Sequence, residues 1–329
     1  MINRVLLYNS GGGIGDAIQI LPLLSTLKDE LKNTKFYYLS AHENHFHSAL
    51  KDFNCDIESL NLDIKYFGFR WWHALIVKKR FKALNIESFD LILDLQSKIR
   101  NSLILKIIPH KKFISSTFNF KLSKPKLIIK KEKRISETIL KAINILYKKN
   151  YQFTEYNINK IHKSFHSESE KLLPNKNYIG FSITQGNVYR KKEWPLDNVI
   201  KISSKLLEKG KIPVFFIEKK NIELKNKINS LLPNALFPEH KSDLACPSLV
   251  TCLGKRLDFA ISIDNGVMHM LSLSKVPMIT LFGPTDAEKF APKYKQSIIL
   301  DSKKIYNSKN VADITVEDVL QAAKQFVNF

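Results

Sequence analysis

The sequence predicts an α/β protein made of two doubly wound domains, each built on a parallel sheet. Along the whole chain, short apolar runs typical of buried strands alternate with amphipathic stretches of helical spacing. This alternation begins at Arg4 and begins again at Tyr178, after a polar stretch of weak periodicity. In both halves, polar residues and glycines follow the strands. In parallel sheets such positions share the carboxyl edge, where ligands bind.

The composition is that of a globular protein with an unusual excess of positive charge. The 329 residues are enough for two cores, and 44% of them are hydrophobic and 25% charged. We place the domain boundary in the polar stretch, giving domains of residues 1–165 and 166–329. The net charge of +21 favours anionic partners such as nucleotides, phosphorylated glycans or an anionic membrane surface. We expect no specific nucleic-acid partner, because no nucleic-acid-binding motif accompanies the charge.

The sequence also predicts a cytoplasmic protein. Its three cysteines are odd in number and lack metal-ligand spacing, which indicates a reducing compartment. The amino terminus runs directly into a strand-like segment without a signal-peptide pattern. No apolar run approaches the roughly 18 residues that span a bilayer, so any membrane contact is expected to be peripheral.

A glycine loop follows the first strand, at Gly11-Gly12-Gly13-Ile14-Gly15-Asp16, and helical spacing then extends to about Lys32. A dinucleotide fingerprint would need glycine where Asp16 stands, and this departure disfavours an oxidoreductase. Asp16 itself has two interpretations. It is either a helix N-cap, with Gln19 completing a capping box, or a functional carboxylate at the sheet edge. Taken alone, the residue favours capping.

Residues 64–81 combine aromatic and basic side chains, including Arg70, Trp71 and Trp72. One interpretation is a core helix with a solvated basic face. The other is a surface that meets an anionic, lipid-linked acceptor, where basic residues pair with phosphates and tryptophan lies at the headgroup level. Both remain open. Further along, the strand at 89–94 also ends in polar residues, and residues 111–133 read as basic and turn-prone.

In the second half, the strand at 259–263 ends in Asp264-Asn265-Gly266, with His269 in the helix that follows. Such a turn is a natural seat for phosphate, because the helix begins with unpaired N–H groups. Asp264 can cap this helix or accept a hydrogen bond from a ligand hydroxyl. Lys192, in an earlier loop, can pair with a diphosphate. The competing interpretations are a plain capped turn and a solvated run of charges.

Four motifs, taken in order, resemble the heptosyltransferase family, glycosyltransferase family nine. They are Gly13-Ile14-Gly15-Asp16, Asp94-Leu95-Gln96, Lys192-Glu193-Trp194-Pro195, and the stretch from Asp264 through Gly283-Pro284-Thr285. The resemblance runs from residue 4 to about residue 290. It implies a GT-B fold, with two Rossmann-like domains facing across a cleft, the first for the acceptor and the second for a nucleotide sugar. It also implies that a final helix, within residues 315–327, packs on the N-terminal domain.

The resemblance further implies the chemistry and its residues. Asp16 would be the general base in an inverting transfer of heptose from ADP-heptose to a lipopolysaccharide core or related surface glycan at the cytoplasmic membrane face. The donor-binding candidates are Thr184, Lys192, Glu218, Asp264, Asn265, Gly266 and His269. The weaker, acceptor-side candidates are Gly13, Gly15, Arg70, Gln96 and Arg100. No obligatory cofactor or metal is expected, because no Asp-x-Asp motif is present where a GT-A enzyme would need one.

The sequence departs from the family pattern at the donor motif. The family usually has Ser or Thr at the position of Asn265, and its run of small residues is replaced by Met270-Leu271-Ser272-Leu273-Ser274. These changes leave the donor sugar open. A glycosyltransferase with a different donor, or another nucleotide-binding enzyme such as a sugar-nucleotide epimerase or dehydrogenase, is the alternative.

Overall fold

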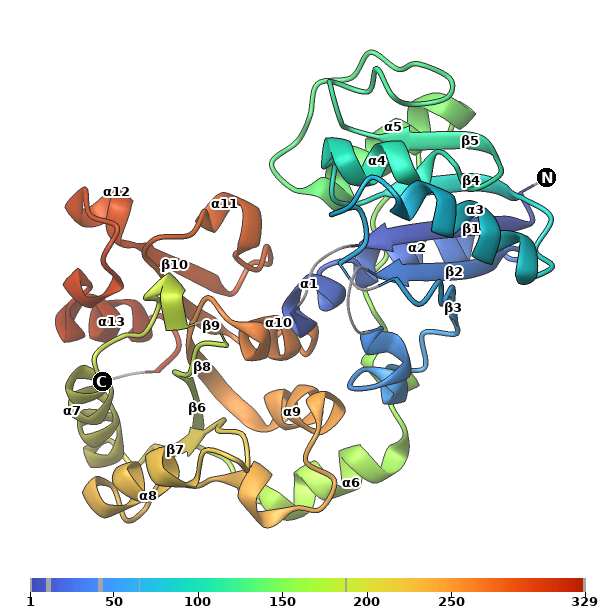
Figure 1. Ribbon diagram of the computed structural model, residues 1–329. Helices are drawn as coiled ribbons and strands as arrows, with labels where there is room; N and C mark the ends of the chain where they lie inside the picture. The colour runs from blue at the N-terminus through green and yellow to red at the C-terminus, as the bar shows by residue number, and fades with distance from the viewer. Residues whose placement is uncertain (1, 10–12, 41–43, 65, 187, 328–329) are drawn as a thin grey trace. The chain divides into compact units, whose positions relative to one another are not determined.

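The computed structural model describes residues 2–9, 13–40, 44–64, 66–186 and 188–327. Contacts divide the chain into two compact units, one ending at Asn157 and the other beginning at Ile158 (Figure 1). The boundary predicted at residue 165 falls within helix α6 (Lys163–Leu172), which packs on α9 (Pro247–Leu253) and so belongs to the second unit.

The first unit contains a parallel sheet of five strands in the order β3-β2-β1-β4-β5. The strands are β1 (Arg4–Asn9), β2 (Lys35–Ser40), β3 (Glu58–Ser59), β4 (Phe89–Asp94) and β5 (His110–Ser115). Helix α2 (Leu21–Glu30) packs with α5 (Ile135–Tyr147), and α3 (His73–Ala83) packs with α4 (Ile99–Leu105). Leu6 and Tyr8 of β1 share one apolar core with residues of α3 and α4.

Two local features of this unit differ from the sequence prediction. The helix expected to run to about Lys32 is divided into α1 (Ile14–Ile18) and α2, because Pro22 begins a new helix in its first turn, where no N–H partner is needed. The stretch expected to be turn-prone from residue 111 begins instead with β5. Only its last three residues are buried, so its apolar signal is short.

The second unit has a parallel sheet in the order β10-β9-β8-β6-β7. Its strands are β6 (Tyr178–Ser182), β7 (Ile212–Phe215), β8 (Leu257–Ile263), β9 (Met278–Phe282) and β10 (Ser297–Asp301). Helix α7 (Leu196–Glu208) covers one face together with α13 (Val316–Ala323), and α10 (Gly266–Leu273) packs with α9 (Figure 1). The other helices are α8 (Ile222–Leu231), α11 (Ala287–Phe290) and α12 (Ser302–Tyr306). The prediction of two doubly wound parallel-sheet domains is confirmed.

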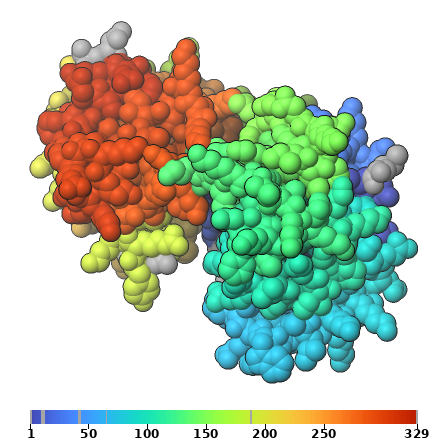
Figure 2. Space-filling model, turned by 90° about the horizontal axis from the view of Figure 1, so that it is seen from above, coloured from blue at the N-terminus to red at the C-terminus, as the bar shows by residue number. Residues whose placement is uncertain are grey.

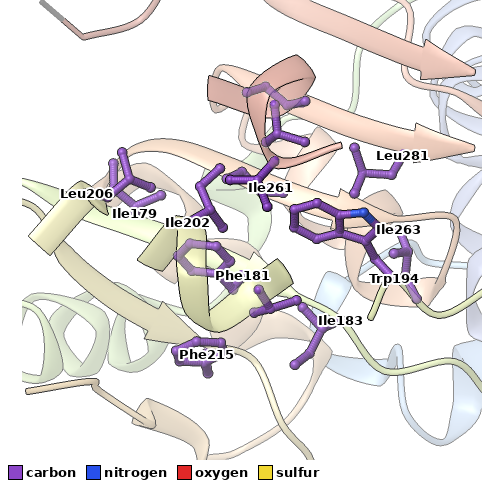
Figure 3. Packing of buried hydrophobic residues seen from close by; sticks show 14 of the residues in the cluster. Ile179, Phe181, Ile183, Trp194, Ile202, Leu206, Phe215, Ile261, Ile263 and Leu281 are labelled. Carbon is purple, nitrogen blue, oxygen red and sulfur yellow. The ribbon is translucent and has the colours of Figure 1, made fainter. Parts of the chain in front are cut away.

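The last helix belongs to the core of the second unit, to which α13 contributes Val316, Val319 and Ala323. The expectation that the final helix also packs on the N-terminal domain stays a prediction. Trp194 lies in the same core, near Ile263 and Leu281 (Figure 3), and its Nε1 donates to the carbonyl of Ile314 at 2.8 Å. The carboxyl-terminal helix therefore completes the fold of the unit that contains it.

Each sheet has one strand at which the winding direction reverses. In the first sheet this strand is β1, because β2 lies on one side of it and β4 on the other; in the second sheet it is β6, between β7 and β8. Ligands of doubly wound proteins bind at the carboxyl ends of the strands at such a point. These ends carry Asn9 and Asp94 in the first unit, and Ser182 and Asp264 in the second.

Candidate active site

Lys192 and Asp264 form a largely buried ion pair at the switch point of the second unit. Lys192 Nζ lies 2.6 Å from Asp264 Oδ2 and also donates to the Asp264 carbonyl at 3.1 Å. The side chains are only 12% and 7% exposed, which excludes a solvated charge for Lys192. The backbone N–H of Lys192 donates to Gln185 Oε1 at 2.9 Å and fixes the loop locally. The flanking Arg190 and Lys191 are exposed and fit the solvated interpretation.

Asn265, rather than Asp264, is the N-cap of α10. Its Oδ1 accepts from the N–H of Met268 at 2.9 Å. Its Nδ2 donates to Ser182 Oγ at 2.7 Å and to the carbonyl of Thr184 at 2.8 Å. The amide thereby joins the end of β6 to the beginning of α10. Its Nδ2 donates two hydrogen bonds, whereas a serine or threonine hydroxyl has a single O–H to donate.

The other donor candidates of this unit lie around the same point. Gly266 is the first residue of α10 and is partly exposed, His269 is buried within the same helix, and Thr184 lies in the loop after β6. Glu218 follows the end of β7, is exposed, and forms an ion pair with Lys220 at 2.5 Å. The structure thus brings Thr184, Lys192 and the α10 residues together. Glu218 follows the neighbouring strand, β7, at the same carboxyl edge of the sheet.

Glu239, which the sequence did not single out, lies beside this edge. It is buried in the short helical turn Pro238–Lys241, and its Oε2 has no hydrogen-bond partner in the described part of the chain. Burial, reinforced by the negative charge of Glu218, raises the pKa of Glu239 to about 7, against a smaller lowering by the backbone of Ile217. Glu239 stands between the apolar residues 235–238 and the polar residues 240–243, where the sequence predicts an exposed side chain and not a buried one.

Asp16 lies at the carboxyl edge of the first sheet but does not cap its helix. The N-cap of α1 is Gly13, and Asp16 is the third helical residue, partly buried. Gln19 does not complete a capping box, because its Nε2 reaches the carbonyl of Gly15 at 3.4 Å. Burial raises the pKa of Tyr38, and the nearby negative charge of Asp16 raises it further. The carboxylate is therefore not committed to capping, which was the interpretation that competed with a catalytic role.

Asn9 connects Gln96 to the Asp16 loop. Gln96 Nε2 donates to Asn9 Oδ1 at 2.6 Å, and Asn9 Nδ2 donates to the carbonyl of Asp16 at 3.1 Å. Asp94, fully buried, accepts from the backbone N–H of Gln96 at 3.0 Å. Through Asn9, Gln96 thus supports the backbone of α1 at Asp16, and its amide nitrogen already donates a hydrogen bond to Asn9.

Arg70 and Arg100 lie together with exposed aromatic rings. The Arg100 guanidinium is 3.7 Å from the centroid of Phe69, and that of Arg70 is 5.2 Å from the ring of Trp72. Both arginines are exposed. Helix α4, which carries Arg100, begins five residues after the β4 strand ends, so Arg100 lies at the carboxyl side of the first sheet.

Comparison with known proteins identifies the family. The model of glycosyltransferase family 9 (heptosyltransferase) matches residues 77–320. No curated protein matches the chain. A family 9 glycosyl transferase from Veillonella parvula has a similar structure, with a TM-score of 0.72 and 16% identity over 98% of this chain and 97% of that one.

Two structures from E. coli are also similar. Heptosyltransferase WaaC with ADP-2-deoxy-2-fluoro heptose has a TM-score of 0.70 at 17% identity, covering 98% of this chain and 100% of that one. ADP-heptose lps heptosyltransferase II has a TM-score of 0.69 at 15% identity, covering 99% and 98%. At these identities the structures establish the fold, GT-B, while the family model covers most of the chain. The chain belongs to glycosyltransferase family 9, the heptosyltransferase family, and is a glycosyltransferase.

Proposed function

We propose that the protein transfers a heptose from ADP-heptose to a lipopolysaccharide core or a related surface glycan. The observation that carries the proposal is the buried Lys192–Asp264 pair beside the amino terminus of α10, at the switch point of the second sheet. The names of the similar E. coli proteins, WaaC with an ADP-heptose analogue and ADP-heptose lps heptosyltransferase II, support the choice of donor.

The donor diphosphate would bind at the amino terminus of α10. The ammonium group of Lys192 has three N–H donors, and the two bonds to Asp264 leave one for a phosphate oxygen. The dipole of α10 adds positive potential at the same place, and the absence of a side chain at Gly266 permits close approach. The ammonium group of Lys192 and the dipole of α10 would stabilise the negative charge that develops on the leaving nucleoside diphosphate.

Asp16 would act as the base on the acceptor side. Its carboxylate takes the proton from an acceptor hydroxyl as that oxygen forms a bond to the anomeric carbon of the heptose. The bond from this carbon to the diphosphate oxygen breaks in the same step, so the anomeric configuration inverts. Asn9 and Gln96 hold the backbone that carries Asp16, and positioning of this kind contributes to the rate.

A phosphorylated or lipid-linked glycan acceptor suits the exposed arginines of the first unit, Arg70 and Arg100. Such an acceptor places the enzyme at the cytoplasmic face of the membrane as a peripheral protein. In the part of the chain that the structure describes, no helix is both long and apolar enough to cross a bilayer.

Asn265 supports a second candidate, a family member with another donor sugar. Asn265 lacks the hydroxyl that the family usually has at this position, and its amide is engaged by Met268, Ser182 and Thr184. Purified protein should be incubated with ADP-heptose and a panel of other nucleotide sugars, each with truncated lipopolysaccharide acceptors, and the products identified by mass spectrometry. Transfer from ADP-heptose above all others supports the proposal, and transfer only from another donor replaces it with the alternative.

Lys192→Ala tests the donor site separately. We expect ADP to bind at least tenfold more weakly, because a charge-assisted hydrogen bond contributes roughly 1.5–3 kcal/mol. Arg190→Ala removes an exposed positive charge two residues earlier and serves as the matched control. Equal dissociation constants for ADP in both variants, measured by calorimetry, would remove Lys192 from the donor site.

A further inference from the structure

The first unit displays large apolar side chains at its surface around the beginning of α3. We call this the aromatic–basic surface and define it by its core residues, Tyr66, Phe69, Arg70, Trp71, Trp72 and Leu75. Trp71 is 77% exposed and Leu75 63% exposed, and the two indole rings lie 5.9 Å apart. The light-blue atoms at one end of the first unit in Figure 2 belong to this part of the chain. Most apolar residues of this size are buried, so several exposed ones in one short segment point to a partner.

The surface continues onto α4. Arg100 packs its guanidinium on the ring of Phe69, and Ile99 and Leu103 of the same helix are exposed. Helix α3 packs against α4 through the side that carries the buried Val77 and Phe81, while Leu75 points to solvent. Two helices and the loop before α3 therefore all carry exposed apolar side chains, and the contact of Arg100 with Phe69 joins α4 to the loop.

The loop that carries the aromatic residues is rigidly anchored. Phe67 is buried against Tyr8 of β1, and the N–H of Gly68 donates to Nδ1 of the buried His73 at 3.1 Å. A Cβ at Gly68 would lie 2.0 Å from Asn101 Oδ1, so only glycine permits the approach of this loop to α4. The exposed rings are thus held outward by fixed neighbours, and little ordering is required when they bind.

The charge around this surface is mainly positive. The stretches 64–84 and 95–112 contain no Asp or Glu, and their basic residues include Arg70, Lys78, Lys79, Lys98, Arg100 and Lys106. The exposed Asp63 at the border is paired with Arg80. Lys78 and Lys79 are exposed one turn after Leu75. Exposed aromatic and aliphatic side chains bordered by basic residues match the interface of an anionic bilayer, where indole rings lie among the headgroups and cations pair with phosphates.

We infer that the aromatic–basic surface docks the protein on an anionic phospholipid bilayer. Only the purpose of this docking, which is to bring the active site to a lipid-linked acceptor, rests on the proposed function. Docking through Trp71, Trp72 and Leu75 needs neither donor nor acceptor, so it can be measured without the reaction.

Tryptophan fluorescence offers a direct test, because the chain has only three tryptophans and Trp194 is buried in the second unit. Full-length protein is mixed with phosphatidylglycerol vesicles, with phosphatidylcholine vesicles and with soluble glycerophosphate. We expect a blue shift of the emission, and quenching by lipids brominated in the upper acyl chain, with the anionic vesicles only. Trp71→Phe/Trp72→Phe should bind these vesicles but lose the shift.

Binding itself is measured by vesicle sedimentation. Trp71→Ser/Leu75→Ser should lower the partition coefficient at least about tenfold, since two buried apolar side chains are lost. Lys78→Gln/Lys79→Gln should lower it by about fivefold for each lysine. The matched controls are Ile128→Ser/Ile145→Ser and Lys130→Gln/Lys131→Gln, which alter exposed residues elsewhere on the same unit.

The outcomes separate docking from catalysis. Loss of vesicle binding with unchanged transfer to a soluble, delipidated acceptor supports the inference. Binding that equals that of the controls overturns it, even if transfer proceeds, and a protein partner for the surface would then be sought. An equal response to soluble glycerophosphate also overturns it, because phosphate rather than a bilayer would be the ligand. If the soluble acceptor is not used by the wild type, the proposed function fails while docking stands or falls on the sedimentation result.

Discussion

Asn265 illustrates how a single side chain at a predicted binding turn can have a structural role. Its amide caps α10 and holds the end of β6 through Ser182 and Thr184. Asn265→Ala should therefore lower the free energy of unfolding by roughly 1–3 kcal/mol, the loss of an N-cap and of buried hydrogen bonds. Urea unfolding measures this. Asn226→Ala, on the exposed side of α8, is the control and should be nearly neutral. A similar loss of unfolding free energy in both variants would contradict the structural role of the Asn265 amide.

Glu239 predicts a pH dependence of stability. Because its folded pKa, about 7, is above the usual 4.5, the folded chain binds more protons than the unfolded chain between these values. Its stabilising contribution is complete below about pH 4.5 and is lost as the pH rises to about 7, by about 3 kcal/mol at most. Calorimetry from pH 5 to 8 should show a weaker fall in melting temperature for Glu239→Gln than for wild type. The exposed Glu208→Gln should follow wild type, and parallel curves for all three proteins would contradict the prediction.

At the scale of single residues, the sequence predicts the site residues that stand in motifs. It does not predict the residues that reach the site only because the chain folds. Lys192, Asp264 and Asn265 are visible because they follow strands or precede a helix. Asn9 and Ser182 are single polar residues at the ends of strands far apart in the sequence. Their partners are defined only once the sheet order is known. For Asp264 the sequence leaves capping and ligand binding open, and both Asp and Asn are good caps; the geometry shows that Asn265 is the cap.

Among the elements, the loop before α3 depends on Gly68. This residue has a φ of +85°, and a Cβ would collide with Asn101, including its backbone Cα at 3.2 Å. Gly68→Ala should lower the free energy of unfolding by roughly 2 kcal/mol or more, the sum of a backbone penalty and a steric one. Gly210→Ala is the matched control. Its φ is +72° with no atom within 4 Å of a Cβ, so it should cost only about 1 kcal/mol. Equal losses in urea unfolding would show that the steric contact is relieved without cost.

Most helices and strands with long apolar patterns could be predicted from the sequence, and the short ones could not. The helix at 135–147 and the strands at the centres of both sheets lie where the pattern indicates. The sequence does not predict the edge strand β5, because two lysines precede its short buried end. The break between α1 and α2 follows from Pro22, whose effect on a helical pattern is local and easily overlooked.

In the whole molecule, each unit has its own core, and the final helix belongs to the second. Helix α13 packs on β9, β10 and α7, and its buried Val316 and Val319 belong to the core of that unit. Sequence pattern alone reveals that this helix is amphipathic, not which apolar surface it covers. The excess of positive charge is likewise a property of the whole chain, with a local concentration at the aromatic–basic surface.

Because each unit has its own core, we expect a nucleotide bound at the proposed donor site to stabilise mainly the second unit. ADP at 100 times its dissociation constant should stabilise the unit that binds it by about 2.7 kcal/mol. Calorimetry of the full chain should then show one transition that moves with ADP and one that moves little. In Lys192→Ala the same ADP concentration should stabilise that transition by no more than about 1.4 kcal/mol, half the wild-type effect, because binding is at least tenfold weaker. A uniform shift of the whole unfolding profile would contradict an ADP site confined to the second unit.

The central claim is that Asp16 removes the proton from the acceptor hydroxyl during sugar transfer. Asp16→Asn keeps the size of the side chain and the backbone bond to Asn9, and it leaves the second unit unaltered. The measurement is single-turnover transfer from the donor identified in the panel, with ADP binding determined on the same preparation and Asp29→Asn, an exposed carboxylate on α2, as the control. We expect ADP binding to stay within about twofold while turnover falls by roughly two to four orders of magnitude. Turnover equal to that of Asp29→Asn would contradict the account.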